Sequence, residues 1–522
     1  MTKRLVRNGW RSEAGLRMTP KHEGRLTRPA PMELAKLGEA IGARVTGAAT
    51  VRGITYDSRL VEPGDLFCAI PGFRTDGHRY IAEARARGAA ALLVERAEVV
   101  PPDCAALVVP HSRIGIAQAA RVLFDDPSRG LWMVGVTGTN GKTTTTHLIR
   151  QVLMAGGIRC GVIGTVHTMV GRETLPSERT TPEAPDLQAT LRYMVRAGEG
   201  AVAMEVSSHS LALHRVEGVQ YDVGVFTNLT QDHLDFHQDM EDYFAAKALL
   251  FEGLGHGDPK GPRRAVLNAD DPWAGRLVGL TTVPLLSYGF AASADVRAES
   301  VEIGTWGSRF MLWLPDENPV RVQVPLGGRF NVSNALGAVA VGHLAGVPLS
   351  RMVEALATVP GVPGRFERVD QGQPFSVVVD YAHSPDGLMN VLSTARELTA
   401  GRLVAVFGAG GDRDRAKRPL MGEVVGRLAD WPIITSDNPR SEDPDAILRD
   451  VAVGVSQAGG RPTLVADRRL AIYEACRAAQ PGDVVMILGK GHEGYQVFAD
   501  RVVPFDDRQV AREALAALGW SS

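Results

Sequence analysis

The feature of this sequence that most constrains its fold is a glycine-rich loop between a predicted strand and a predicted helix. The apolar run LWMVGV (131–136) predicts a buried strand, and THLIRQVLMAGG (146–157) predicts a helix that ends at a glycine pair. The loop between them contains TGTNGKTT (137–144). Glycines let backbone N–H groups converge on phosphate oxygens, and the start of a helix adds positive potential. The segment therefore predicts an α/β domain that binds a nucleoside triphosphate with Mg²⁺.

Two residues of this loop have predicted chemical roles. Lys142 is expected to reach the β and γ phosphates, and Thr143 is expected to hold Mg²⁺. The strict phosphate-loop pattern has glycine where this chain has Val136, so the alternative is a glycine-rich turn with an incidental lysine. The agreement of strand, loop and helix favours nucleotide binding. The other loop residues predicted to bind the nucleotide are Gly138, Thr139, Asn140, Gly141 and Thr144.

The chain length of 522 residues is typical of about three domains. We expect a smaller N-terminal α/β domain (31–128), a central doubly wound parallel sheet with the phosphate loop (129–358) and a Rossmann-like C-terminal domain (359–522). The runs SVVVDYA, RLVAVFGA, WPIITS and DVVMILG predict strands of the third domain. Residues 1–30, with eight Lys or Arg against two Glu, predict a disordered basic tail.

Charge and cysteine content exclude several classes of protein. The formal net charge of −2 does not indicate a protein that coats nucleic acid or a membrane surface. No apolar run reaches the roughly 18 residues that a membrane-spanning helix requires. The four cysteines have no CxxC spacing, which argues against disulfides or a zinc ribbon. We expect a cytoplasmic monomer that acts on small molecules, without nucleic acid or membrane insertion.

A second candidate site is the segment TNLTQDHLDFHQDMEDYFAAK (227–247), which follows a predicted strand. His233 and His237 are four residues apart and Asp235 lies between them, so zinc is one candidate ion. No HExxH motif and no nearby cysteine support zinc, and the nucleotide loop favours the harder ion Mg²⁺.

Lys247 closes this segment in an unusual position. On a helix over 240–254 it falls in the middle of the apolar face. Spacing alone favours a lysine that snorkels to the edge of that face. The alternative is a desolvated neutral amine that captures CO2 as a carbamate, an oxygen anion that Mg²⁺ can use.

A series of motifs resembles, in order, the Mur ligase family, and within it the MurE type. They are TGTNGKTT, MEVSSHSL, TNLTQDHLD, AAKALLF, LGGRFNVSNAL, VVDYAHSPDGL, FGAGGDRDRAKRPLMG, DNPRSEDP and GKGHEGYQ. The segment 57–81 is similar to that family's uridine-nucleotide domain, and the resemblance covers about residues 34–500. It implies an ATP-dependent carboxylate–amine ligase (EC 6.3.2 type) of peptidoglycan synthesis, and hence a role in cell shape, the cell cycle and cell division. Such a ligase joins a diamino acid to UDP-N-acetylmuramoyl-L-alanyl-D-glutamate through an acyl phosphate.

The resemblance also implies roles for residues around the nucleotide. Glu205, His233 and a carbamylated Lys247 (N6-carboxylysine) join Thr143 as ligands of two Mg²⁺ ions, so carbamylation replaces snorkelling as the expectation. Lys142, Lys247 and His233 are the implied catalytic residues, while Asp235 and His237 orient the loop. Further nucleotide contacts are implied for Asn331, Arg365, Asp380 and His383. Because these lie on both sides of a linker, we expect the third domain to close over ATP and exclude water.

The other two substrates have their own implied residues. Those matching the muramoyl-dipeptide positions are Ser58, Thr180, Thr181, Ser207 and Arg215, and the turn 76–78 is expected at the uridine end. DNPR matches enzymes that add meso-diaminopimelate, because Arg440 offers a planar fork to the distal carboxylate. Gly489 and Glu493 are expected to receive the distal ammonium, with Asp437 and Asn438 beside them.

Several alternatives remain at this point. DNPR could be a simple turn, and the added amino acid could be L-lysine or L-ornithine. A folylpolyglutamate-synthetase-like ligase shares the chemistry and the loop, but fits the first and last motifs poorly. A P-loop motor or regulator would bind nucleotide without ligating anything, and gives no account of Lys247 or of the DYAHSP segment.

Overall fold

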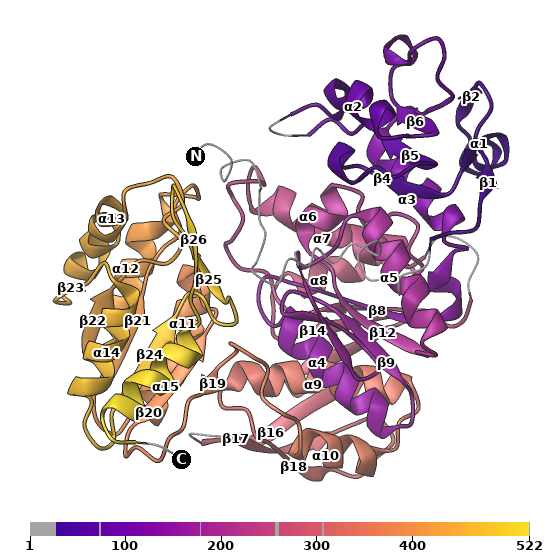
Figure 1. Ribbon diagram of the computed structural model, residues 1–522. Helices are drawn as coiled ribbons and strands as arrows, with labels where there is room; N and C mark the ends of the chain where they lie inside the picture. Colours follow the sequence, from indigo (N-terminus) through magenta and orange to yellow (C-terminus); the bar gives the residue numbers. More distant parts are fainter. Residues whose placement is uncertain (1–27, 73–74, 178, 256–259, 305–306, 521–522) are drawn as a thin grey trace.

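The chain folds into three α/β domains, which form three lobes in Figure 1. The computed structural model describes residues 28–72, 75–177, 179–255, 260–304 and 307–520. Most of the predicted disordered tail therefore lies outside the described residues. No helix among the described residues is long and apolar enough to cross a membrane.

The N-terminal domain is built on a five-stranded sheet of order β2-β7-β6-β5-β4, parallel except for the edge strand β2. Its strands are β1 (Met32–Glu33), β2 (Arg44–Thr46), β3 (Thr50–Val51), β4 (Gly53–Thr55), β5 (Asp65–Cys68), β6 (Ala91–Val94) and β7 (Ala106–Val108). Its α-helices are α1 (Leu34–Ile41), α2 (Ile81–Ala86) and α3 (Ser112–Leu123), with short 3-10 turns at Ser58–Leu60, Gly77–Tyr80, Ala97–Val99 and Pro127–Gly130.

The central domain has an eleven-stranded sheet of order β11-β10-β9-β12-β8-β13-β14-β15-β16-β17-β18. Its strands are β8 (Trp132–Thr137), β9 (Cys160–Ile163), β10 (His167–Val170), β11 (Glu173–Pro176), β12 (Ala201–Glu205), β13 (Val223–Phe226), β14 (Arg264–Asn268), β15 (Leu285–Gly289), β16 (Val296–Gly304), β17 (Gly307–Trp313) and β18 (Val320–Val324). Its helices are α4 (Lys142–Ala155), α5 (Ala184–Arg196), α6 (Ser208–Ala212), α7 (Met240–Gly253), α8 (Ala274–Val278), α9 (Arg329–Leu344) and α10 (Leu349–Ala357).

Helices cover both faces of this sheet, as a doubly wound fold requires (Figure 1). α4, α9 and α10 bury their apolar residues against one face. α5, α7 and α8 pack on the other face. The parallel strands between them are apolar on both sides, which explains why the runs before the loops read as continuous hydrophobic segments.

The C-terminal domain has a six-stranded sheet of order β19-β20-β24-β21-β22-β23. Its strands are β19 (Glu367–Arg368), β20 (Ser376–Asp380), β21 (Leu403–Phe407), β22 (Trp431–Ile434), β23 (Thr463–Leu464), β24 (Val484–Leu488), β25 (Tyr495–Val497) and β26 (Val502–Pro504). Its helices are α11 (Pro385–Leu398), α12 (Lys417–Leu428), α13 (Pro444–Gln457), α14 (Arg468–Ala478) and α15 (Asp507–Ala517). The four strands predicted for this domain are all present, as β20, β21, β22 and β24.

The central sheet departs from the predicted all-parallel form at both edges. β10 and β11 form an antiparallel hairpin beside β9, and β16, β17 and β18 form an antiparallel meander. The outer strands alternate buried and exposed residues, because only one face of each is covered. The limits of the domains at residues 128 and 358 remain a prediction.

Candidate active site

The site forms where three neighbouring parallel strands end at one edge of the central sheet. β8 lies between β12 and β13, with Val136 beside Glu205 and Thr137 beside Phe226. The phosphate loop follows β8, Glu205 ends β12, and the segment 227–239 follows β13. Ligands of doubly wound sheets bind at this edge, where the strand order reverses.

The phosphate loop is held by the segment that follows β13. Asn228 accepts from the Asn140 N–H through its side-chain oxygen (2.9 Å) and donates to the Asn140 carbonyl (3.1 Å). Gly138 has φ of +150°, and a Cβ there would lie 1.9 Å from Thr227 Oγ1. α4 begins at Lys142 directly after Gly141, so its first N–H groups face the cavity side of the loop.

Two lysines, the half-buried Lys142 and the fully buried Lys247, converge on a single carbonyl of the loop. Lys142 Nζ and Lys247 Nζ each donate to the Gly138 oxygen at 2.8 Å, and Lys142 also donates to the Thr139 oxygen at 2.8 Å. Among the described residues neither lysine forms an ion pair with a carboxylate. Burial lowers the pKa of both amines, that of Lys247 well below its usual value. No described carboxylate pairs with either lysine, so the loop can attract an anionic group.

The snorkelling interpretation of Lys247 is wrong. Its side chain projects from α7 inward to the loop, is 1% exposed, and lies with Nζ 4.4 Å from the centre of the Tyr243 ring. The amine consequently has no route to solvent along the helix surface. A buried amine with a lowered pKa is the chemical state that carbamate formation requires.

Thr143 and Glu205 offer oxygen ligands suited to Mg²⁺. Thr143 Oγ1 donates to Glu205 Oε2 at 3.0 Å. Thr165 fixes the same carboxylate, its N–H donating to Oε1 (2.7 Å) and its hydroxyl to Oε2 (3.0 Å). A hydroxyl and a carboxylate at the start of a phosphate-loop helix fit a hard divalent cation.

His233 adds a neutral nitrogen beside this pair. It takes a left-handed backbone conformation (φ 57°), and its side chain is 40% exposed and lines the cavity. Burial lowers its pKa to about 3, although Asp232 opposes the shift. The imidazole is therefore unprotonated at neutral pH and able to coordinate a metal. His237 instead bonds Ser208 (2.9 Å) and Asp242 (3.2 Å) and does not line the cavity, while no role is resolved for Asp235.

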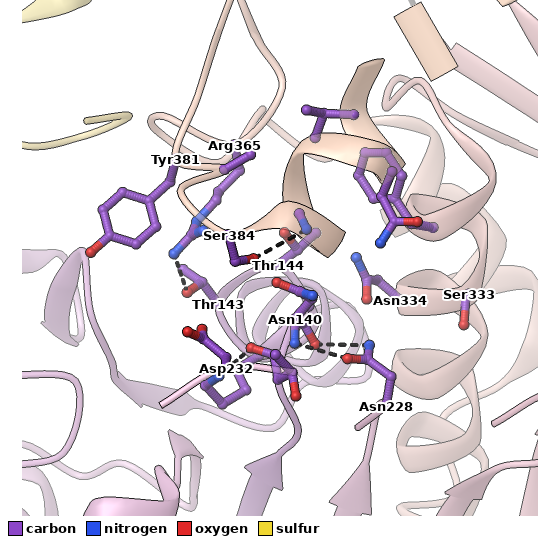
Figure 2. A pocket seen from close by; sticks show the side chains of 18 of the residues that line it. Asn140, Thr143, Thr144, Asn228, Asp232, Ser333, Asn334, Arg365, Tyr381 and Ser384 are labelled. Carbon is purple, nitrogen blue, oxygen red and sulfur yellow. Dashed lines mark hydrogen bonds between the residues drawn. The ribbon is translucent and has the colours of Figure 1, made fainter. Parts of the chain in front are cut away.

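The third domain reaches over the phosphate loop, as Figure 2 shows for Arg365 and Tyr381. Arg365 donates to Thr143 Oγ1 at 3.1 Å, with its guanidinium 4.5 Å from the centre of the Tyr381 ring. Asp386, at the start of α11, accepts from Asn140 (2.8 Å) and Thr230 (2.9 Å). These contacts hold the central and C-terminal domains together across the site.

Asp380 and His383 lie on the same side of the cavity. Asp380 accepts from the backbone N–H groups of Phe366 (2.6 Å) and Ala382 (2.7 Å), so it braces the turn. His383 Nδ1 lies 2.9 Å from the Tyr381 carbonyl. Burial, reinforced by Lys417, lowers the pKa of His383, which keeps the imidazole neutral.

These residues enclose a cavity of about 760 Å³. Thr139, Gly141 and Thr144 line it together with the residues above. One side is apolar and able to receive a nucleobase, and sequence reasoning missed it. Its lining residues are Phe290, Val301, Ile303, Phe330 and Val391. Val301 and Ile303 come from β16, Phe290 follows β15, Phe330 lies in the first turn of α9, and Val391 lies in the middle of α11. Of these, only Phe330 lies within a quoted motif, LGGRFNVSNAL.

Asn331 does not line this cavity. Its side chain donates to the Gly327 carbonyl (2.8 Å) and accepts from Asn334 (3.2 Å). Asn334, one turn further along α9, lines the cavity beside Ser333 (Figure 2). The motif thus identified the right helix turn, and the spacing of three residues on α9 could have indicated Asn334.

The residues predicted for the muramoyl dipeptide divide into two groups. Thr180 and Ser207 line the cavity. Thr181 lies just behind them and donates to the Glu205 carbonyl (2.9 Å). Arg215 forms an ion pair with Glu183 at 2.9 Å, and burial lowers its pKa.

Ser58 lies apart from these residues, in the N-terminal domain. Its hydroxyl donates to Glu83 at 2.9 Å. In the predicted uridine turn, Asp76 accepts from the His78 N–H (3.0 Å) and its ring (2.6 Å). The structure therefore orders this turn but does not bring it into the described cavity.

The DNPR and GKGHE segments meet outside the nucleotide cavity. Asn438 donates to Glu493 at 2.9 Å, and the carboxylate of Asp437 lies against Gly489. Arg440 has φ of 54° and donates to the Gly411 carbonyl (2.6 Å), and it has no carboxylate partner among the described residues.

Arg413 is a second guanidinium at this place, and sequence reasoning missed it. Burial, reinforced by the nearby charge of Arg413, lowers the pKa of Arg440. Arg413 also has no ion pair within the described part of the chain. Two neighbouring guanidinium groups that form no ion pair among the described residues indicate a site for an anionic group.

A phosphate loop closed by a Rossmann-like domain defines the class of the protein as a multidomain enzyme that closes over a nucleotide. Family models support a narrower class. "Mur ligase family, catalytic domain" matches residues 50–128, "Mur ligase middle domain" matches 136–342, and "Mur ligase, glutamate ligase domain" matches 364–491.

Curated relatives match almost the whole chain. The UDP-N-acetylmuramoyl-L-alanyl-D-glutamate–2,6-diaminopimelate ligase of Geobacillus thermodenitrificans is 48% identical over 90% of this chain and 96% of its own length. The enzyme of the same name from Streptomyces coelicolor is 45% identical over 95% and 99%. A solved structure with that name is 35% identical, with a TM-score of 0.62 over 90% of this chain and 95% of the other. The chain belongs to the Mur ligase family, among its MurE-type members.

More distant structures share the fold alone. The MurF ligase of Acinetobacter baumannii is 19% identical, with a TM-score of 0.65 over 94% of this chain and 98% of the other. A folylpolyglutamate synthase of Mycobacterium tuberculosis is also 19% identical, with a TM-score of 0.59 over 73% and 92%. The alternative raised by the sequence therefore has the same architecture but far lower identity.

Proposed function

We propose that this protein is an ATP-dependent ligase that adds meso-2,6-diaminopimelate to UDP-N-acetylmuramoyl-L-alanyl-D-glutamate. The observation that carries the proposal is the convergence, at one sheet edge, of side chains suited to phosphate and to Mg²⁺. Lys142 and Lys247 meet at the Gly138 carbonyl, and Thr143 pairs with Glu205 beside them. The relatives that match almost the whole chain are named for this reaction.

The reaction requires an activated carboxylate, because a carboxylate ion does not acylate an amine in water. The D-glutamyl γ-carboxylate oxygen attacks the γ-phosphorus of ATP, the bond to ADP breaks, and an acyl phosphate forms. The free amine then attacks the carbonyl carbon, phosphate leaves, and the amine loses a proton as the amide forms. Lys142 neutralises the phosphates during the first step.

Mg²⁺ would reduce the repulsion between triphosphate and carboxylate. We propose Thr143 and Glu205 as ligands of one ion, and His233 with a carbamylated Lys247 as ligands of a second. Carbamylation joins the neutral Lys247 Nζ to the carbon of CO2 and releases one proton, which replaces a buried neutral amine by an oxygen anion. The neutral state favoured by burial of Lys247 supports this step.

The remaining nucleotide contacts are assigned from the residues in and around the cavity. The loop residues 138–144 would hold the phosphates, with Arg365 above Thr143. Asp380 and His383 would shape the wall contributed by the third domain, and the apolar residues near Phe330 would receive the base. Asn331 would act through Asn334, which it holds in place.

The muramoyl dipeptide would approach from the N-terminal domain. Thr180 and Ser207 would contact its acidic end near Glu205, and Thr181 and Arg215 would support them from behind. Ser58 and the ordered turn 76–78 would serve the uridine end. These assignments rest on the matched motifs.

The diamino acid would bind between DNPR and GKGHE. Arg440, with Arg413 beside it, would receive the distal carboxylate. Glu493 and the Gly489 carbonyl would receive the distal ammonium, with Asp437 and Asn438 framing the site. L-Lysine and L-ornithine lack that carboxylate, so they would leave both guanidinium groups unpaired.

The cellular setting follows from the reaction. We propose that the protein acts as a cytoplasmic monomer in peptidoglycan synthesis, and thereby in cell shape and division.

Substrate-dependent release of ADP tests the proposed function. Repeated turnover to ADP is expected only when UDP-N-acetylmuramoyl-L-alanyl-D-glutamate, the diamino acid, ATP and Mg²⁺ are all present. A motor or regulatory nucleotide hydrolase would release ADP without the dipeptide substrate, and such release at an undiminished rate would contradict the proposal. Lys142→Ala serves as the inactive reference.

A further inference from the structure

Lys490, two residues after the end of β24, is a fully buried lysine that no predicted role accounts for. Its side chain is 0% exposed, and Nζ donates to Glu493 Oε2 (3.0 Å) and to Asn438 Oδ1 (3.1 Å). Asn438 Nδ2 donates to the same Glu493 oxygen (2.9 Å), while the Val497 N–H donates to Asn438 Oδ1 (3.0 Å). The network fixes the orientation of both the amide and the carboxylate.

One oxygen of Glu493 is left over by this network. Oε2 receives Lys490 and Asn438, whereas Oε1 has no donor among the described residues. The side chain of Glu493 is 19% exposed, so Oε1 is accessible to a bound molecule. Lys490 therefore leaves Glu493 Oε1 available to a bound molecule. Its positive charge also partly offsets the negative charge of the Glu493 carboxylate.

The charges around this place cancel. Arg413, Arg440 and Lys490 are positive, whereas Asp412, Asp437 and Glu493 are negative. The charges of Arg413, Asp412, Asp437 and Glu493 all act on Arg440, since these groups lie near it, and Lys490 pairs with Glu493. The sum of three positive and three negative groups is zero. A nearby buried pair, Arg468 and Asp507 at 2.7 Å, is neutral and leaves this sum unchanged.

We propose that Lys490 is a positioning residue that sets the preference for a diamino acid with a second carboxylate. This inference rests on the proposed function. The distal end of diaminopimelate bears a carboxylate and an ammonium, so its net charge is zero. The distal end of L-lysine is a lone ammonium, which a site of net charge zero does not favour, whereas the net charge of −1 left by loss of Lys490 would attract it. Lys490 thus acts through Glu493. It weakens the attraction of that carboxylate for the distal ammonium of an amino acid that has no distal carboxylate.

The test compares the ratio of kcat/KM for meso-diaminopimelate to that for L-lysine in full-length variants, with tripeptide measured by mass. Lys490→Met removes the charge and is expected to lower this ratio at least about tenfold, by raising turnover of L-lysine. Lys490→Arg keeps the charge and is expected to stay within about threefold of the wild-type ratio. The KM for ATP is expected to change less than about twofold in both variants. Arg501→Gln, which removes an exposed cation of the same domain, is the matched control.

A purely structural role predicts a different result. It would lower kcat/KM for both amino acids by the same factor and leave the ratio unchanged in Lys490→Met, and that outcome would overturn the inference. Glu493→Gln provides an independent arm if Lys490→Met does not fold. It raises the net charge of the site from zero to +1, which opposes a lone ammonium, so the ratio is expected to rise, and a constant or lower ratio would overturn the inference.

A failure of the proposed function and a failure of the role of Lys490 give different experimental results. If the wild-type protein forms no tripeptide with diaminopimelate, the proposed function itself fails. If it forms tripeptide but the ratio does not respond to Lys490→Met and Glu493→Gln, only the role of Lys490 fails.

Discussion

At the scale of single residues, Arg440 is the side chain expected to recognise the distal carboxylate. Arg440→Ala removes a charge-assisted, two-pronged contact, so we expect the KM for diaminopimelate to rise on the order of 100-fold. The KM for ATP is expected to change little, because Arg440 lies outside the nucleotide cavity. Steady-state kinetics with each substrate varied in turn measures both values.

Arg440→Lys separates charge from shape. It keeps the positive charge but loses the planar fork, so an intermediate KM for diaminopimelate is expected. Arg501→Ala, an exposed arginine of the same domain, should leave the kinetics unchanged. If Arg440→Ala leaves both KM values as in the wild type, Arg440 does not recognise the amino acid.

Lys247 supports a second prediction at this scale. Lys247→Ala removes the only group that can become a carbamate at this position, so activity should fall at least about 100-fold. Short-chain carboxylic acids should restore part of it by supplying an oxygen anion in the vacated space. Lys247→Arg keeps a cation but cannot be carbamylated, so it should stay inactive with or without acid. Full activity of Lys247→Ala without any acid would refute the role.

Sequence reasoning could anticipate some of these residues but not others. The helical period placed Lys247 on the apolar face of α7, where the structure finds it. It could not decide between snorkelling and burial, because that depends on the phosphate loop 109 residues earlier in the chain. Arg413 and Lys490 lie within quoted motifs but received no predicted role, because their neighbours Arg440, Asn438 and Glu493 come close only in the folded chain.

At the scale of elements, the phosphate loop depends on glycine at position 138. Gly138→Ala would place a Cβ 1.9 Å from Thr227 Oγ1 at a φ of +150°, so the loop must distort. We expect ATP binding to weaken by at least about tenfold. Calorimetric titration of the variant with ATP and Mg²⁺ measures this loss.

Gly157→Ala is the matched control for this element. Gly157 follows the other end of α4, also has positive φ (+80°), but has open space around its missing Cβ. Its replacement should cost about 1 kcal/mol of stability without weakening ATP binding. Equal losses of ATP affinity in the two variants would show that strain in general, and not the loop geometry, explains the effect.

Elements with strong periodicity were predictable, and the edges of the central sheet were not. Some strands coincide with continuous apolar runs of the sequence, because both faces of the sheet are buried there. These strands are β8, β12, β13 and the four parallel strands predicted for the third domain. β10, β11, β17 and β18 are the outer strands of the central sheet, and their pairing depends on their neighbours. The meander also supplies Val301 and Ile303 to the cavity, which explains why the apolar wall was missed.

At the scale of the whole molecule, Asp386 connects the third domain to the phosphate loop. Its carboxylate accepts from Asn140 and Thr230 across the domain boundary, and from Asn390 on its own helix (3.1 Å). Asp386→Ala should loosen closure, raise the KM for ATP roughly tenfold and increase ADP release relative to amide product, because the acyl phosphate is then open to water.

Asn390→Ala tests whether the effect of Asp386→Ala depends on the contacts between the central and C-terminal domains. It removes the contact within α11 but leaves both contacts between the domains, so the amounts of ADP and amide product should remain equal. A variant Asp386→Ala with unchanged KM for ATP and equal amounts of ADP and product would show that closure does not depend on this contact.

The most direct test of the central claim is to identify the product by mass. The protein is incubated with UDP-N-acetylmuramoyl-L-alanyl-D-glutamate, ATP and Mg²⁺, and with meso-diaminopimelate, L-lysine or L-ornithine in parallel. We predict a tripeptide product with diaminopimelate and little or none with the other two. A clear preference for lysine or ornithine would contradict the assignment of Arg440 and Lys490 while keeping the ligase. No amide product with any of the three would contradict the proposed function.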